Sequence, residues 1–256
     1  MANFKNKVAL ITGGTCGIGF ATAKLFAQSN AKIFIVGRNS ERGKQALERL
    51  SAITPDAYFW PADISQPEQV EQMIAKCIEV FGRLDIAINN AAASFPLVPI
   101  AEIPLAAIDE SIATDLRGTW CCMKHEINAM LKTGGGAIVN VSSTNGIAAS
   151  PDAGMYSATK HGVNGLTSAA AREYIARGIR INTVCPGAID TPRRQRRLEG
   201  KSAAEIAEHD NELEKIIPAQ RVGRADEIAA PIVWLCSDEA SYVVGHHLVI
   251  DGGLTA

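Results

Sequence analysis

Short apolar runs alternate with helix-like segments along the whole chain, and this alternation limits the possible folds more than any other sequence feature. The runs are apolar on both faces, which is typical of parallel strands covered by helices on either side. Strands that alternate with helices form right-handed βαβ units and build a doubly wound sheet. The predicted strands lie at 8–11, 33–36, 57–60, 84–88, 136–141, 179–185 and 247–250. The sequence therefore predicts an α/β fold, with about seven parallel strands and helices on both faces of the sheet.

No linker, repeat or low-complexity stretch divides the chain, so we expect a single domain spanning residues 1–256. This length suits one large domain. Hydrophobic residues make up 47% of the chain and charged residues 20%, which supplies a sizeable core and excludes general disorder. Among the helices, two long ones are predicted at about 105–132 and 155–177.

The region 187–220 is the one irregular segment predicted, and it is polar and basic. Its basic residues are Arg193, Arg194, Arg196, Arg197 and Lys201. Such a run of charge is usually the solvated face of a helix. The alternative is a mobile lid over a substrate site, whose positive charge would favour anionic ligands.

Net charge and cysteine content exclude several classes of protein. The 25 Lys and Arg residues against 27 Asp and Glu give a charge of −2, which argues against nucleic-acid or membrane-surface binding. No apolar run reaches the ~18 residues that span a bilayer, and residues 1–7 lack the apolar stretch of a secretory signal. The six cysteines follow no metal-binding or disulfide spacing. We therefore expect a cytoplasmic protein with reduced thiols, no metal and a small-molecule partner.

A glycine-rich loop follows the first predicted strand and opens the first predicted helix. It reads Thr12-Gly13-Gly14-Thr15-Cys16-Gly17-Ile18-Gly19. Glycine lets a ligand approach the main chain closely, and the start of a helix presents unpaired N–H groups and a positive dipole end to a phosphate. The carboxyl end of the first parallel strand is where dinucleotides bind in open sheets. The loop thus predicts a Rossmann-like, dinucleotide-binding fold, and the lack of a Gly-Lys-Ser/Thr sequence excludes a P-loop.

Several further motifs follow this loop in a fixed order, and together they are far more specific than the loop alone. Residues 12–19 match TGxxxGxG, and Asn89-Asn90-Ala91-Ala92 resembles NNAG. Tyr156-Ser157-Ala158-Thr159-Lys160 matches YxxxK, Ser143 lies upstream of it, and Pro186-Gly187 follows the sixth strand. Over essentially its whole length, the chain therefore resembles the short-chain dehydrogenase/reductase family. The resemblance implies an oxidoreductase that transfers a hydride between a nicotinamide cofactor and a secondary alcohol or ketone.

The choice between NAD and NADP depends on the residues after the second strand. A carboxylate there binds the ribose 2′-hydroxyl of NAD, whereas an arginine receives the 2′-phosphate of NADP. The chain places Arg38 and Asn39 at this point and no acid, and a planar guanidinium binds phosphate well. The sequence favours NADP(H). NAD(H) stays open, because Arg38 also reads as an exposed turn residue and Cys16 occupies the place of a further basic residue in the family.

The resemblance also implies the rest of the cofactor site. Asp63 corresponds to the acid that hydrogen-bonds the adenine, although a helix-capping aspartate is the competing interpretation. The other implied cofactor residues are Gly13, Thr15, Gly17, Ile18, Gly19, Ile64, Asn90, Ala91, Tyr156, Lys160, Pro186, Gly187, Ile189 and Thr191.

Tyr156 and Lys160 carry the predicted chemistry, because residues four apart on a helix project from one face. A phenol titrates near pH ~10 and is a poor general base at neutrality. An ammonium ~4 Å away favours the phenolate by ~4 kcal/mol at an effective dielectric of ~20. Tyr156 is therefore predicted to exchange a proton with the alcohol or carbonyl oxygen, and Ser143 to donate a hydrogen bond that positions this oxygen.

Two residues depart from the family pattern. Asp115 stands where the family has a fourth catalytic residue, an asparagine, and an ionised carboxylate accepts hydrogen bonds but cannot donate them. We expect Asp115 to order a water, with activity retained but lowered. Ala92 replaces a glycine, and an alanine held at positive φ costs about 1–2 kcal/mol.

Two classes of function are therefore open. The first is an oxidoreductase of a secondary alcohol or ketone, with NADP(H) or, alternatively, NAD(H). The second is a nucleotide-binding regulator with weak or no turnover, for which Asp115 is the supporting feature and the intact Ser143, Tyr156 and Lys160 are the opposing one. The family resemblance also implies a homotetramer, in which the last strand packs across a subunit interface.

Overall fold

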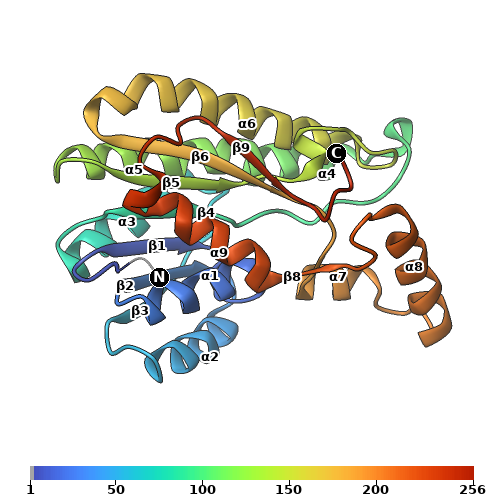
Figure 1. Ribbon diagram of the computed structural model, residues 1–256, viewed down its shortest axis with the longest axis horizontal. Coiled ribbons are helices and arrows are strands. Elements are labelled where there is room, and N and C mark those ends of the chain that lie inside the picture. The colour runs from blue at the N-terminus through green and yellow to red at the C-terminus, as the bar shows by residue number, and fades with distance from the viewer. Residues whose placement is uncertain (1–2) are drawn as a thin grey trace.

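The computed structural model describes residues 3–256 and contains a seven-stranded, wholly parallel sheet in the order β3-β2-β1-β4-β5-β6-β9 (Figure 1). The strands are β1 (Val8–Thr12), β2 (Lys32–Gly37), β3 (Ala57–Pro61), β4 (Ile86–Asn89), β5 (Gly136–Val141), β6 (Ile179–Pro186) and β9 (His247–Ile250). Strand order reverses between β1 and β4, where Thr12 pairs with both Val36 and Asn89. A crevice at such a switch point, beyond the carboxyl ends of the strands, is the usual ligand site of an open α/β sheet.

Helices cover both faces of this sheet, as the apolar strands require. One core cluster joins the sheet to α1 (Gly17–Gln28), α2 (Ser40–Ser51) and α9 (Ala225–Cys236). A second cluster joins the opposite face to α3 (Pro67–Phe81), α5 (Thr119–Leu131) and α6 (Gly154–Tyr174). The predicted doubly wound α/β fold is confirmed, and all seven predicted strands are present.

The predicted helix at 105–132 is not one regular α-helix. It divides into α4 (Leu105–Ser111), a π-helical segment (Ile112–Gly118) and α5. π-Helical turns are rare and occur frequently at functional sites. Here the segment contains Asp115, so the irregularity falls at the residue that departs from the family motif.

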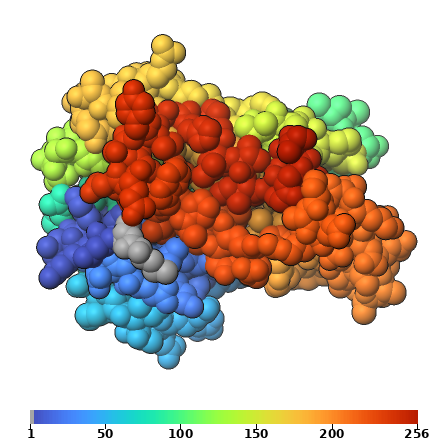
Figure 2. Space-filling model, in the orientation of Figure 1, coloured from blue at the N-terminus to red at the C-terminus, as the bar shows by residue number. Residues whose placement is uncertain are grey.

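The region 187–220 is also more ordered than predicted. It contains the short strand β7 (Ile189–Asp190), which pairs with β8 (Gly223–Arg224), and the helices α7 (Pro192–Arg197) and α8 (Ala203–Ile216). The two helices project from the body of the molecule at the carboxyl edge of the sheet (Figures 1 and 2). The prediction of a basic region is wrong for the segment as a whole, because its six basic residues are outnumbered by seven acidic ones. Positive charge is concentrated on and just after α7, whereas α8 is mainly acidic.

No helix within residues 3–256 has the length and apolar character needed to cross a membrane. The same residues contain no grouping of His, Cys, Asp and Glu side chains that could hold a metal ion. All six cysteines are free thiols, of which only Cys16 is not fully buried.

A buried polar network lies between α5, α6 and the centre of the sheet. Glu126 of α5 is fully buried, and one of its oxygens accepts a hydrogen bond of 3.0 Å from the Asn89 side-chain amide. The same amide donates to Asn140 at 2.9 Å, and the Asn140 amide donates to Thr167 at 2.8 Å. The other oxygen of Glu126 has no partner within residues 3–256. Burial raises the pKa of Glu126 to about 8, against a smaller opposing effect of the Asn89 hydrogen bond.

Candidate active site

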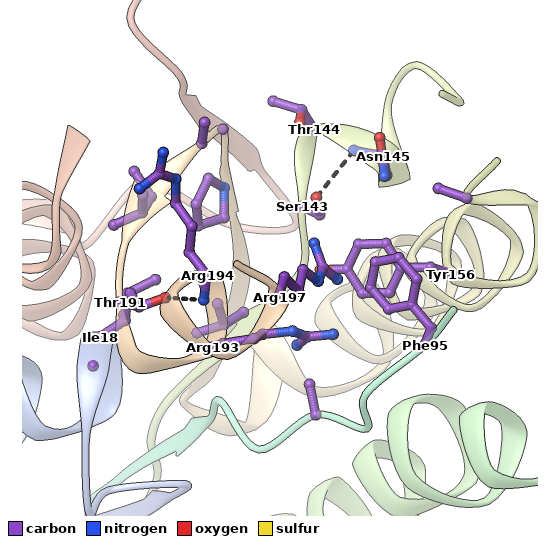
Figure 3. Close-up of a pocket in the computed structure, with 18 of the residues that line it drawn as sticks. Ile18, Phe95, Ser143, Thr144, Asn145, Tyr156, Thr191, Arg193, Arg194 and Arg197 are labelled. Carbon is purple, nitrogen blue, oxygen red and sulfur yellow. Dashed lines mark hydrogen bonds between the residues drawn. The ribbon is translucent and has the colours of Figure 1, made fainter. Parts of the chain in front are cut away.

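A cavity of about 580 Å³ opens at the carboxyl ends of the strands and extends beneath α7 (Figure 3). It brings together residues from the glycine loop, the end of β4, the segment after β5, α6 and the segment after β6. The predicted site residues that line it are Gly13, Gly17, Ile18, Asn90, Ala91, Ser143, Tyr156, Lys160, Pro186, Gly187, Ile189 and Thr191. Those that do not line it are Thr15, Gly19, Arg38, Asn39, Asp63, Ile64 and Asp115.

The glycine loop has the geometry of a phosphate cradle. Gly17 begins α1, and the side chain of Cys16 before it makes no capping hydrogen bond. The first N–H groups of the helix are therefore not capped by the side chain of Cys16. Gly19 lies against the backbone at the other end of the loop, where an added Cβ would overlap the carbonyl oxygen of Gly13. A loop that leaves helix N–H groups free and the main chain uncovered fits the diphosphate of a dinucleotide.

Asn90 braces this loop from the neighbouring strand. Its side-chain amide donates to the carbonyl oxygens of Thr12 and Gly13, at 3.1 and 3.2 Å. Its backbone N–H donates to the Thr12 hydroxyl at 3.0 Å, and the Ala91 N–H reaches the same hydroxyl at 3.2 Å. The ends of β1 and β4 are therefore joined side by side across the switch point.

The residues expected around the adenosine lie outside the cavity, at the ends of β2 and β3. Arg38 is exposed, and its guanidinium is 3.8 Å from a carboxylate oxygen of Asp63. The other oxygen of Asp63 accepts from the backbone N–H of Ser65, at 2.9 Å. Asn39 caps α2 by accepting from the N–H of Arg42. Arg38 is thus free to meet a phosphate on one side, with a single carboxylate as its only ion-pair partner in the described chain.

Three of the four predicted catalytic residues, all but Asp115, meet at the cavity wall. Tyr156 and Lys160 both belong to α6, and the Lys160 Nζ lies 5.6 Å from the centre of the Tyr156 ring. Lys160 is buried and donates to the carbonyl oxygen of Val141 at 3.0 Å, which fixes the ammonium at the end of β5. Ser143 follows β5, and its hydroxyl oxygen accepts from the Asn145 N–H at 3.1 Å, which leaves the hydroxyl proton free to be donated (Figure 3).

Asp115 lies behind this wall rather than in it. One carboxylate oxygen accepts from the backbone N–H of Ala93 at 2.8 Å, and the other is buried without a partner within residues 3–256. Asp115 therefore ties the π-helical segment to the chain that leaves β4. Ala92, the second departure from the family, is not at positive φ, so the strain expected there is absent.

Among the lining residues that were not predicted as catalytic or cofactor-binding, Phe95, Arg193 and Arg197 lie around Tyr156. The two arginines were predicted only as part of a basic lid. The Phe95 ring stacks on the ring of Tyr156, with centroids 4.0 Å apart and planes at 16°. Arg193 donates to the carbonyl oxygen of Ala93 at 2.6 Å. The two arginines stand four apart in the basic run, a spacing that places both on one face of a helix once α7 is recognised. Phe95 follows β4 in a loop, where no periodicity identifies it.

Comparison with known proteins agrees with the geometry. A family profile described as enoyl-(acyl carrier protein) reductase matches residues 13–255. The chain is 38% identical over 257 residues to 2,5-dichloro-2,5-cyclohexadiene-1,4-diol dehydrogenase of Sphingobium indicum, covering 100% of both chains. It is 37% identical to cyclohexanol dehydrogenase of an Acinetobacter species, covering 99% of this chain and 96% of the relative. The crystal structure of levodione reductase superimposes with a TM-score of 0.94 at 36% identity, covering 98% of each chain.

The sheet order, the glycine cradle at its switch point and these matches define one class of protein. The chain belongs to the short-chain dehydrogenase/reductase family. It is accordingly an NAD(P)-dependent oxidoreductase.

Proposed function

We propose that the protein interconverts a secondary alcohol and its ketone, with NADP(H) as the favoured cofactor and Tyr156 as the general acid and base. The observation that carries this proposal is the meeting of Tyr156, Lys160 and Ser143 in one cavity beside the glycine cradle. A bound nicotinamide cofactor supplies the hydride acceptor or donor. The two dehydrogenases compared above are named for cyclic alcohols, which favours a substrate whose hydroxyl or carbonyl is on a ring.

Each of the three residues has a separate task. Tyr156 passes a proton to or from the substrate oxygen. The buried ammonium of Lys160 lies 5.6 Å from the centre of the Tyr156 ring and is held by a hydrogen bond to the carbonyl oxygen of Val141, which keeps a positive charge beside the phenol. The hydroxyl of Ser143 donates to the substrate oxygen and holds it in line with Tyr156.

Arg38 supports the choice of NADP(H). It stands at the end of β2, with 59% of its side chain exposed, where a 2′-phosphate can form charge-assisted hydrogen bonds with its guanidinium. Asp63 weakens this support in part, because its carboxylate lies 3.8 Å from the Arg38 guanidinium and neutralises some of its positive charge. NAD(H) is the alternative cofactor for the same chemistry.

A screen of cyclic ketones and alcohols with both cofactors, followed by nicotinamide absorbance, tests the proposal. We expect turnover with at least one cyclic secondary alcohol or ketone, and a higher kcat/KM with NADP(H). A higher kcat/KM with NAD(H) would overturn the cofactor preference alone. Cofactor binding without turnover on the whole panel would support the nucleotide-binding regulator instead.

The effect of Asp115 separates an enzyme from such a regulator. In Asp115→Asn the amide oxygen still accepts from Ala93, while the negative charge is lost and a donor is gained. We expect kcat for alcohol oxidation to rise about 2- to 10-fold, with an altered pH–rate profile, because the substitution removes a negative charge behind the cavity wall and adds a hydrogen-bond donor there. The same change at the exposed Asp109 of α4 is the matched control. Superimposable pH–rate profiles for wild type and Asp115→Asn would contradict the expectation.

We also propose that the protein is a cytoplasmic homotetramer with no nucleic-acid or membrane partner. β9 is the edge strand of the sheet, and the last part of the chain extends over the outer surface (Figure 2). Tyr242 is fully exposed beside it, and Val249 of β9 and Trp234 are more than one third exposed. An uncovered sheet edge flanked by large apolar side chains favours association with a second copy. Sedimentation velocity measures the assembly.

A further inference from the structure

The cavity carries a strong and one-sided charge. Of its lining residues, six are cationic and none is acidic. The cationic residues are Lys160, Arg193, Arg194, Arg196, Arg197 and Lys201. A low-dielectric cleft lined by one sign of charge attracts ligands of the opposite sign.

Two of the arginines face the catalytic tyrosine. Arg193 and Arg197 lie one turn apart on α7 and point toward the stacked rings of Phe95 and Tyr156 (Figure 3). The Arg193 guanidinium carbon lies 5.2 Å from the centre of each ring, and that of Arg197 lies 4.2 Å from the centre of Phe95. Because Arg193 and Arg197 lie beside the stacked rings of Phe95 and Tyr156, we place these two cations at the substrate end of the cavity.

Arg193 and Arg194 already have polar partners, whereas Arg197 and the exposed Arg196 have none among residues 3–256. Arg194 forms an ion pair with Asp210 of α8, and Arg193 donates to Ala93. The Arg197 guanidinium makes no hydrogen bond and no ion pair with any of the residues 3–256. Burial and the nearby charge of Arg193 both lower the pKa of Arg197. More than a third of Arg197 is exposed to solvent, and no acidic side chain among residues 3–256 pairs with it or with Arg193, so a bound anion would relieve the repulsion between these two cations.

Apolar side chains also line the cavity. Leu97, Leu198 and Leu213 line the cavity together with Phe95. Because Phe95 covers the face of the Tyr156 ring, a substrate reaches the phenol at its edge, next to Ser143, and extends from there toward α7. A guanidinium and a carboxylate match in shape and form two parallel hydrogen bonds.

Given the proposed function, we propose that the substrate is an alcohol or ketone whose compact apolar skeleton carries a carboxylate, and that Arg197, supported by Arg193, binds this carboxylate. Arg197 is then the residue that determines specificity for acids over neutral analogues. A neutral analogue leaves the two arginines uncompensated and loses affinity.

The test compares 4-oxocyclohexanecarboxylate with its methyl ester in wild type, in Arg197→Gln and in Lys215→Gln. Lys215 is the matched control, since it is an exposed cation of α8 outside the cavity. We expect wild type and Lys215→Gln to prefer the acid by about 10- to 100-fold in kcat/KM. We expect Arg197→Gln to lose this preference through a higher KM for the acid, with kcat/KM for the ester and KM for the cofactor unchanged. The preference in wild type should also weaken at high salt.

Three outcomes would overturn the inference. The first is an equal kcat/KM of wild type for the acid and the ester. The second is an equal decrease of kcat/KM for both compounds in Arg197→Gln, which would indicate a packing role. The third is a raised KM for the cofactor with the acid preference intact. Calorimetry with cyclohexanecarboxylate and its methyl ester, neither of which can react, keeps the test separate from turnover. If the screen finds no activity, acid-selective binding that is lost in Arg197→Gln still supports the anion site, and its absence in wild type overturns it.

Discussion

Tyr156→Phe should lower kcat by about 10²- to 10⁴-fold, the range that general acid–base catalysis usually contributes. The substitution removes a single oxygen. The ring remains, so the stacking on Phe95 at 4.0 Å and the proximity to Lys160 are expected to persist. Cofactor affinity should therefore change little while turnover is lost. Steady-state nicotinamide absorbance measures kcat, and fluorescence titration measures cofactor binding.

Tyr174→Phe is the matched control, because Tyr174 ends the same helix and does not line the cavity. Its activity should equal that of wild type. If Tyr156→Phe keeps more than about one tenth of the wild-type kcat, a group other than this phenol moves the proton. If it loses cofactor binding together with turnover, the substitution has disturbed the site and the role of Tyr156 must be tested by its pH–rate profile.

Glu126→Gln should stabilise the protein at neutral and alkaline pH by about 3 kcal/mol near pH 7. The pKa of Glu126 is raised from 4.5 to about 8 in the folded protein, so the native state holds this proton more tightly than the unfolded state. The contribution of this proton to the free energy of unfolding is complete below about pH 4.5. It is lost as the pH rises through about 8, at ~1.4 kcal/mol per pH unit. A neutral glutamine removes this loss and still offers an oxygen to the Asn89 amide.

Denaturant unfolding at pH 5 and at pH 8 measures the effect. The free energy of unfolding of Glu126→Gln, relative to wild type, should increase between these two values of pH. Glu71→Gln, which changes an exposed glutamate of α3 in the same way, should leave the difference constant. Parallel pH dependences for wild type and Glu126→Gln would show that the buried carboxyl titrates normally.

The sheet could be predicted because its strands are apolar on both faces. β5 and β9 begin and end at the predicted residues, since Gly136 and the polar ends of these runs mark sharp limits. The motif residues of the cavity were also identified, because their order along the chain reflects where parallel strands end. For this topological reason, one edge of the sheet brings together Thr12, Asn89 and the residues that follow β5 and β6.

The features that the sequence did not reveal depend on tertiary contacts. The π-helical segment has an ordinary helical pattern, and its wider turn accompanies the hydrogen bond between Asp115 and Ala93. The segment 187–220 was predicted to be irregular, yet Thr191 and Ser202 cap separate helices there. Arg194 pairs with Asp210, whereas Arg197 has no ion-pair partner among residues 3–256, and no local sequence pattern distinguishes the two arginines.

The brace formed by Asn90 has a consequence for how a dinucleotide is received. One amide side chain donates to two successive carbonyl groups of the turn where we propose that the diphosphate binds, which holds the shape of this turn. A receptor surface that is set in advance loses little conformational freedom on association, and more of the contact energy is then expressed as affinity. The hydrogen bonds that Asn90 makes between β4 and β1 thus hold the proposed cofactor site in one shape, whereas adjustment to different ligands is left to the helices above it.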